Sequence, residues 1–185
     1  MTRKVFAVLL LLPLLGGCWD YKDLDRLSIV TGMAVDSAPG GRVLVTLETV
    51  SSSEGTVKAR LVRGEGRTAE AAVREAKKQL ERELYFGNMS IVVFGESVGI
   101  HAPVEWLKSV RGIRETVYIA AASACAGELF DTEEGAFQLR DMLDASETVK
   151  PAELYRFGNT LPLFALTEGK HPALTGIVPV SGTGS

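Results

Sequence analysis

Three consecutive segments near the start of the chain carry strand-like patterns, and they constrain the fold more than any other feature. Residues 27–35 are rich in branched apolar side chains and end in a cluster of turn-forming residues at 36–41. Residues 43–50 alternate apolar and polar side chains, and residues 56–62 repeat the alternation after a polar loop at 51–55. The sequence therefore predicts an antiparallel meander whose first two strands form a hairpin.

The segment after the meander predicts a helix. Thr68 is a favourable N-cap, Glu70 lies near the positive end of the helix dipole, and apolar residues recur at helical spacing from 69 to 84. The opposite face carries i,i+4 charge pairs, which are worth about 0.2–0.5 kcal/mol each. We expect a helix over 68–84 with a solvated charged face rather than a binding site.

The rest of the chain alternates short apolar segments with helical patterns. Two segments with buried-strand character lie at 89–95 and 117–126, and further helices are expected at 103–110 and 132–144. The order of elements predicts an α+β domain over 18–150, with a mixed sheet that opens in an antiparallel meander and about three helices packed on it.

Proline and glycine become frequent toward the C-terminus. This composition predicts that residues 151–185 form an irregular segment or a linker, with regular structure limited to a short helix near 152–157.

The N-terminus has the charge and hydropathy order of an export signal. Arg3 and Lys4 precede an apolar run over 5–15, which at about 11 residues is shorter than the roughly 20 that a spanning helix needs. Two glycines then lead directly to Cys18, the arrangement required for lipoprotein processing. We predict a lipoprotein signal peptide at 1–17 and lipid attachment at Cys18. A plain secretory signal, or an uncleaved apolar helix, is the alternative.

Aromatic residues follow the predicted lipid site at once. Trp19 and Tyr21 are candidates for the membrane interface, where amphipathic rings are favoured. The alternative is that both rings pack on their own domain.

Charge and residue types exclude several function classes. The chain has 20 Lys and Arg against 23 Asp and Glu, with no basic run, so nucleic-acid binding has no support. No phosphate-binding glycine motif and no paired metal-ligand spacing occur, and we expect no cofactor or metal. Cys125 lies among small residues and is expected to act as a small core hydrophobe, because His101 and His171 form no recognisable catalytic pattern with it. The chain is predicted not to be an enzyme.

From Cys18 onward the sequence resembles the Ger(x)C family, the lipoprotein C subunits of spore germinant receptors. The resemblance starts at Cys18-Trp19-Asp20 and continues in the strand Ser28-Ile29-Val30-Thr31-Gly32-Met33-Ala34-Val35-Asp36. Family-like segments then follow in order at 64–68, 84–88, 91–96 and 114–126. One departure is Asn88, which stands where the family commonly has a histidine. The other is that the chain ends near the point where the family's larger C-terminal region begins.

The resemblance implies a non-catalytic subunit anchored through Cys18 on the outer face of the spore inner membrane of a sporulating Gram-positive bacterium. Its implied partners are the A-type and B-type membrane subunits of a receptor for small nutrients. Its implied role is assembly or signalling in spore germination. A stand-alone solute-binding or cell-surface lipoprotein is the alternative, and the former would need two lobes and a cleft.

Overall fold

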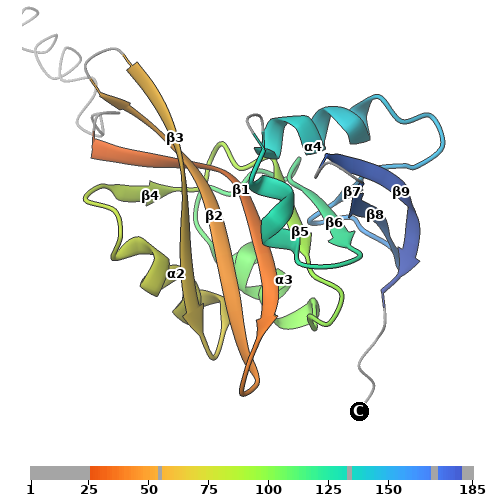
Figure 1. Cartoon of the computed structure of the whole chain (residues 1–185), viewed down its shortest axis with the longest axis horizontal. Coiled ribbons are helices and arrows are strands. Elements are labelled where there is room, and N and C mark those ends of the chain that lie inside the picture. The colour runs from red at the N-terminus through yellow and green to blue at the C-terminus, as the bar shows by residue number, and fades with distance from the viewer. Residues whose placement is uncertain (1–25, 54–55, 133–134, 168–170, 181–185) are drawn as a thin grey trace, which may run out of the picture.

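A single mixed β-sheet with helices on both faces forms the core of the domain (Figure 1). The computed structural model describes residues 26–53, 56–132, 135–167 and 171–180. Within them the strands are β1 (Leu27–Ala38), β2 (Arg42–Ser53), β3 (Thr56–Gly66), β4 (Glu83–Tyr85), β5 (Ile91–Phe94), β6 (Tyr118–Ala122), β7 (Ala152–Glu153), β8 (Thr160–Leu166) and β9 (Pro172–Pro179). The helices are α2 (Ala69–Lys77), α3 (His101–Ser109), the 3-10 helix η3 (Ala126–Phe130) and α4 (Gly135–Asp144). The predicted α+β class is confirmed.

The antiparallel meander is also confirmed. β1 pairs with β2 from Ile29↔Val50 to Ala38↔Arg42. The whole length of β3 pairs with β2, from Val43↔Gly66 to Ser53↔Thr56. Gly40 and Gly41 make the hairpin turn with φ of 74° and 70°, a backbone conformation that glycine adopts without strain. The strands are longer than predicted, because β2 continues through Ser53 where a polar loop was expected.

The remaining strands build a parallel region beside β1. The sheet order is β3-β2-β1-β5-β6-β8-β9, and β1, β5, β6 and β8 are mutually parallel neighbours. β5 is buried on both faces: Ile91 and Val93 join one core cluster, and Val92 and Phe94 join the other. This two-sided burial explains the unbroken apolar pattern from which a buried strand was predicted.

Helices cover both faces of the sheet. α2 and α3 pack on the face that carries Val45, Leu47 and Val92, whereas η3 and α4 pack on the face that carries Ala34 and Val93. Both core clusters are fully or almost fully buried.

The predicted extent of the first helix is wrong. Thr68 caps α2 as expected, with Ala71 N donating to Thr68 Oγ1 at 3.2 Å, but the helix ends at Lys77. Leu84 lies in β4 and pairs with Ser28 of β1. Pairing with the sheet thus overrides the helical spacing of the sequence at Leu84.

One other boundary also differs. The strand expected at 117–126 stops at Ala122, and the chain then turns into η3, which the sequence did not predict. The helix expected at 132–144 is described as α4 from Gly135 to Asp144, and residues 133–134 lie outside the described residues.

The prediction of an irregular segment from 151 onward is wrong for the described residues. β8 pairs in parallel with β6, and β9 returns antiparallel to β8. The short helix expected near 152–157 is replaced by β7, which pairs with β6. Pro172 and Pro179 lie in β9, an edge strand where a missing N–H is tolerated, and Pro162 of β8 lies next to the register shift between Leu163 and Phe164. Residues 181–185 lie outside the described residues.

Candidate functional site

The residues predicted to hold the lipid and to touch the membrane fall outside the described part of the chain. Cys18, Trp19 and Tyr21 all precede Arg26, where the description begins. Their roles stay predictions. Within the described residues, no helix is long and apolar enough to cross a bilayer.

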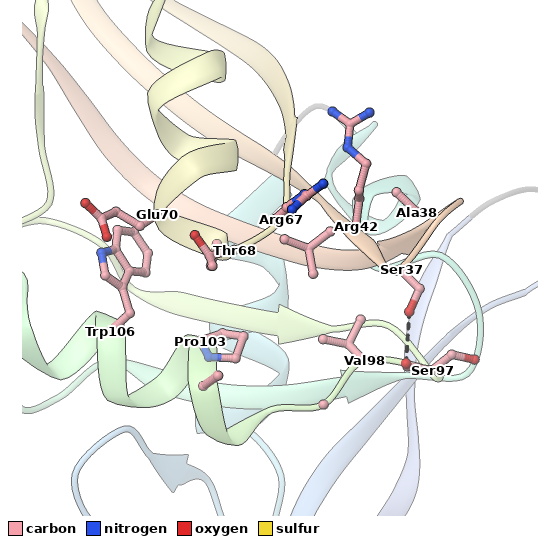
Figure 2. A pocket seen from close by; sticks show the side chains of 15 residues that line it. Ser37, Ala38, Arg42, Arg67, Thr68, Glu70, Ser97, Val98, Pro103 and Trp106 are labelled. Atoms are coloured by element: carbon pink, nitrogen blue, oxygen red, sulfur yellow. Dashed lines mark hydrogen bonds between the residues drawn. The ribbon is translucent and has the colours of Figure 1, made fainter.

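A cavity of about 480 Å³ opens at the turn end of the β1–β2 hairpin, between α2 and α3 (Figure 2). Ser37 Oγ donates to Ser97 O at 2.9 Å and thereby ties the hairpin to the segment before α3. Arg67 and Thr68 line the cavity at the start of α2, and Trp106 lines it from α3. The cavity therefore joins cationic, hydroxyl and aromatic groups, and it holds no described nucleophile–base pair or metal-ligand cluster.

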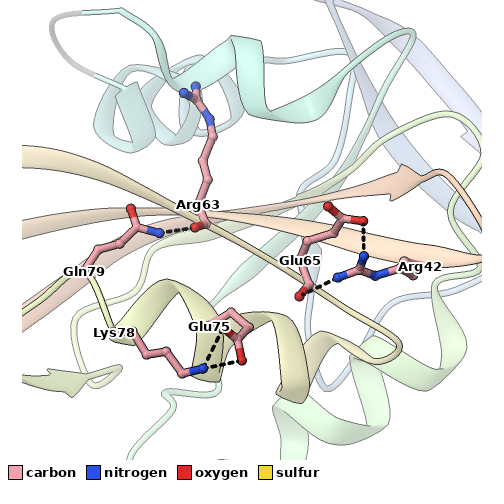
Figure 3. Close-up of polar contacts among 6 residues, drawn as sticks. All are labelled: Arg42, Arg63, Glu65, Glu75, Lys78 and Gln79. Atoms are coloured by element: carbon pink, nitrogen blue, oxygen red, sulfur yellow. Dashed lines mark hydrogen bonds and ion pairs between the residues drawn. The ribbon is translucent and has the colours of Figure 1, made fainter.

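Beside this cavity, α2 is held tightly against β3. A Cβ placed on Gly64 would meet Ala72 O and Ala76 N, and one placed on Gly66 would meet Ala72 N. Gln79 Nε2 donates to Arg63 O, and Arg42 pairs with Glu65 at 3.1 Å (Figure 3). The glycines of the Gly64-Glu65-Gly66 segment thus let β3 and α2 pack closely. The sequence of this segment is not a phosphate-binding motif.

On the other face of the sheet, a buried carboxylate of β1 binds the backbone of η3. Asp36 is only 5% exposed and accepts hydrogen bonds from Ala126 N at 2.6 Å and from Gly127 N at 2.9 Å. These N–H groups begin η3, so Asp36 satisfies donors that the short helix leaves unpaired. The last residue of the family-like strand is therefore a cap for a segment some 90 residues away in sequence.

A second buried carboxylate works in the same way. Glu48 is 7% exposed, accepts from Ala136 N at 3.0 Å, and also accepts from Thr31 Oγ1. A Cβ on Gly135 would meet the Glu48 carboxylate, so this close approach requires glycine. Asp36 and Glu48 together attach η3 and α4 to the β1–β2 hairpin.

Cys125 differs from its predicted role. It is partly exposed rather than buried in a core, and its Sγ donates to Asp36 Oδ2 at 3.4 Å. Burial, followed by the neighbouring Asp36 charge, raises the pKa of the Cys125 thiol above its ordinary value. A raised pKa leaves less thiolate, which is the opposite of what nucleophilic catalysis needs.

Sequence reasoning missed Asp36 and Glu48 as fold-determining residues. The only signal was the position of each: Asp36 closes an apolar strand, and Glu48 is the only charged residue between positions 43 and 53. Asn88, the departure from the family pattern, accepts a hydrogen bond from Arg114 Nη2 at 3.1 Å.

The family relationship follows from comparison with known proteins. A family model described as "Spore germination protein N-terminal domain" matches residues 20–178. The chain belongs to this family.

Relatives within the spore germination family show the same relationship. Spore germination protein KC of Bacillus subtilis (strain 168) is 30% identical over 114 residues, which cover 53% of this chain and 28% of that protein. Spore germination protein B3 of the same organism is 25% identical over 140 residues, which cover 70% of this chain and 37% of that protein. The chain thus spans about a third of the length of these relatives.

One solved structure is also similar. The crystal structure of the GerBC protein matches over 85% of this chain and 54% of that chain, with 12% identity and a TM-score of 0.27. The assignment to the spore germination family rests on the sequence match over 20–178 and not on this structural comparison.

Proposed function

We propose that this chain is the N-terminal domain of a lipoprotein subunit of a spore nutrient germinant receptor. In this proposal Cys18 carries the lipid, the domain lies at the outer face of the spore inner membrane, and the partners are the A-type and B-type receptor subunits. The role is assembly or signalling and is non-catalytic.

The observation that carries the proposal is the family match, which begins at residue 20, two residues after the predicted lipid site. The match therefore includes residues 20–26, which lead from the predicted lipid site into β1. The short apolar run at 5–15 with Gly16-Gly17-Cys18 supplies the processing signal. A lipid with two or more acyl chains would hold the domain stably on a bilayer without a spanning helix.

The fold supports a role in binding other proteins or in scaffolding more than a role in binding a solute. The described strands form one sheet, whereas a solute-binding lipoprotein of the kind considered above would have two lobes around a cleft. The buried carboxylates of Asp36 and Glu48 are occupied as caps of η3 and α4, so they hold the fold together.

Mass spectrometry of the protein from membranes tests the anchor. The expected mature chain lacks residues 1–17 and begins with a diacylglyceryl-modified Cys18. Cells fed a labelled fatty acid should incorporate the label into the wild-type chain and not into Cys18→Ala, while Cys125→Ala should incorporate it normally. Label in Cys18→Ala, or a mature chain that retains residues 1–17, would refute the proposed anchor.

A further inference from the structure

A groove of about 660 Å³ lies between α4 and the outer strands β2 and β3, on the face of the sheet opposite α2. Both η3 and α4 pack on β1, where Asp36 and Glu48 hold the starts of these helices. The outer strands keep apolar side chains that the helices of this face do not fully cover: Val50 and Leu61 are half-buried, and Ala59 is exposed. The groove is therefore an open part of the sheet face.

Phe137 places an exposed aromatic ring beside this groove. It lies in the first turn of α4 and lines the groove, and 53% of it is exposed. Ala136 and Leu139, its neighbours in the helix, are buried in the core. Aromatic side chains are enriched at protein–protein interfaces, where they act as anchors in well-packed pockets. The groove and this ring together offer an apolar contact surface to a partner.

The wall of the groove that η3 and α4 form is acidic. Residues 128–144 carry six Asp and Glu against one Arg. That cation, Arg140, pairs with Asp144 at 3.4 Å. Asp141 lines the groove, is exposed, and forms no ion pair within the described residues. This wall thus presents negative charge that its own segment does not neutralise.

Negative charge also predominates when the opposite wall and the adjoining residues are counted. Arg60 lines the groove from β3, and Arg63 of β3 pairs with Asp131 at 2.9 Å. Residues 48–63 and 128–144 together carry eight acidic and four basic side chains: Glu48, Glu54, Glu128, Asp131, Glu133, Glu134, Asp141 and Asp144 against Lys58, Arg60, Arg63 and Arg140. The groove therefore favours a partner that brings positive charge to the α4 side.

We propose that this groove binds a segment of another protein in which apolar side chains are flanked by Lys or Arg. The apolar side chains contact Phe137, Leu61 and Val50, and the cations face Asp141. Two other occupants have the wrong charge. Residues 19–25 of this chain carry three Asp and one Lys, and a second copy would bring a second acidic wall, so like charges would meet in both cases. The proposal rests on the proposed function only in the choice of spores as the place where the partner is sought.

Photo-crosslinking in intact spores tests the groove. The full-length protein carries benzoylphenylalanine in place of Phe137, which keeps an aromatic ring at this position, or in place of Ile177 of β9, which is 60% exposed and does not line the groove. Mass spectrometry identifies the protein and the peptide that become crosslinked on irradiation. The crosslinker at position 137 is then combined with Asp141→Lys, or with Glu147→Lys as a matched charge reversal. Glu147 is exposed and lies outside the groove.

We expect position 137 to crosslink to a protein other than this chain, through a peptide with apolar residues and an excess of Lys and Arg. Asp141→Lys should lower the yield at least about 10-fold, because like charges then meet at the interface, whereas Glu147→Lys should leave it nearly unchanged. Position 177 should not give this product.

Several results would overturn the proposal: no crosslink at position 137, a crosslink to a second copy or to residues 19–25, an acidic crosslinked peptide, or a yield that Asp141→Lys does not change. The germination response of spores that lack the protein is measured separately. A basic partner found at position 137, together with normal germination without the protein, would keep the groove proposal and overturn the proposed function, so the two failures are distinguishable.

Discussion

Replacement of Asp36 by Ala is expected to destabilise the domain strongly, because Asp36 joins β1 to η3. The change leaves Ala126 N and Gly127 N, which donate at 2.6 and 2.9 Å, without their acceptor in a buried site. An unsatisfied buried donor costs about 1–3 kcal/mol, so two donors cost about 4 kcal/mol. For a domain of this size each kcal/mol shifts the Tm by about 2–4 °C, and the expected loss is therefore about 12 °C.

Urea and thermal unfolding followed by circular dichroism measure this loss. Asp36→Asn keeps one acceptor oxygen and should fall between Asp36→Ala and the wild type. Asp141→Ala is the matched control, because Asp141 is exposed on α4 and surface substitutions usually change stability by less than about 0.5 kcal/mol. If the free energy of unfolding of Asp36→Ala lies within about 1 kcal/mol of the wild-type value, the proposed capping of η3 by Asp36 is wrong.

Other substitutions test separate parts of the packing. Glu48→Ala should cost about 2–4 kcal/mol in urea unfolding, because Ala136 N and Thr31 Oγ1 lose a buried acceptor; a change as small as that of Asp141→Ala would contradict this. Gly64→Ala should cost about 1–3 kcal/mol or more, because its Cβ meets the backbone of α2, whereas Gly99→Ala meets nothing and should be tolerated; equal stability of the two variants would refute the packing argument. Cys125 should react with iodoacetamide more slowly than a free thiol at mildly alkaline pH, because burial and Asp36 raise its pKa, and Asp36→Asn should speed the reaction; a slower reaction in that variant would show that Asp36 does not suppress the thiolate.

The local patterns of the sequence predicted the elements that depend on local signals. The β1–β2 hairpin followed from a turn cluster between two apolar patterns, and the start of α2 followed from the Thr68 cap. The buried strand β5 followed from its unbroken apolar run.

The errors arose where distant contacts decide the structure. The residues at 83–85 have helical spacing but become β4 because β1 offers a pairing edge. β8 and β9 contain prolines that suggested irregular structure, yet Leu161 and Phe164 are buried once β8 pairs beside β6.

The candidate site shows the same limit. The processing signal ending at Cys18 is a local pattern and could be proposed from sequence alone. The roles of Asp36 and Glu48 depend on segments about 90 residues distant, namely the starts of η3 and α4. No spacing rule joins such positions, so only the folded arrangement identifies them as caps.

Germination of spores whose only copy of this protein is altered at Cys18 tests whether the domain acts in germination from a lipid anchor. Spores that lack the protein should respond poorly to nutrient, as followed by the fall in optical density. The wild-type chain should restore the response. Cys18→Ala, produced in equal amount, should not restore it, whereas Cys125→Ala should. Full restoration by Cys18→Ala would contradict the account of a membrane-anchored germination subunit.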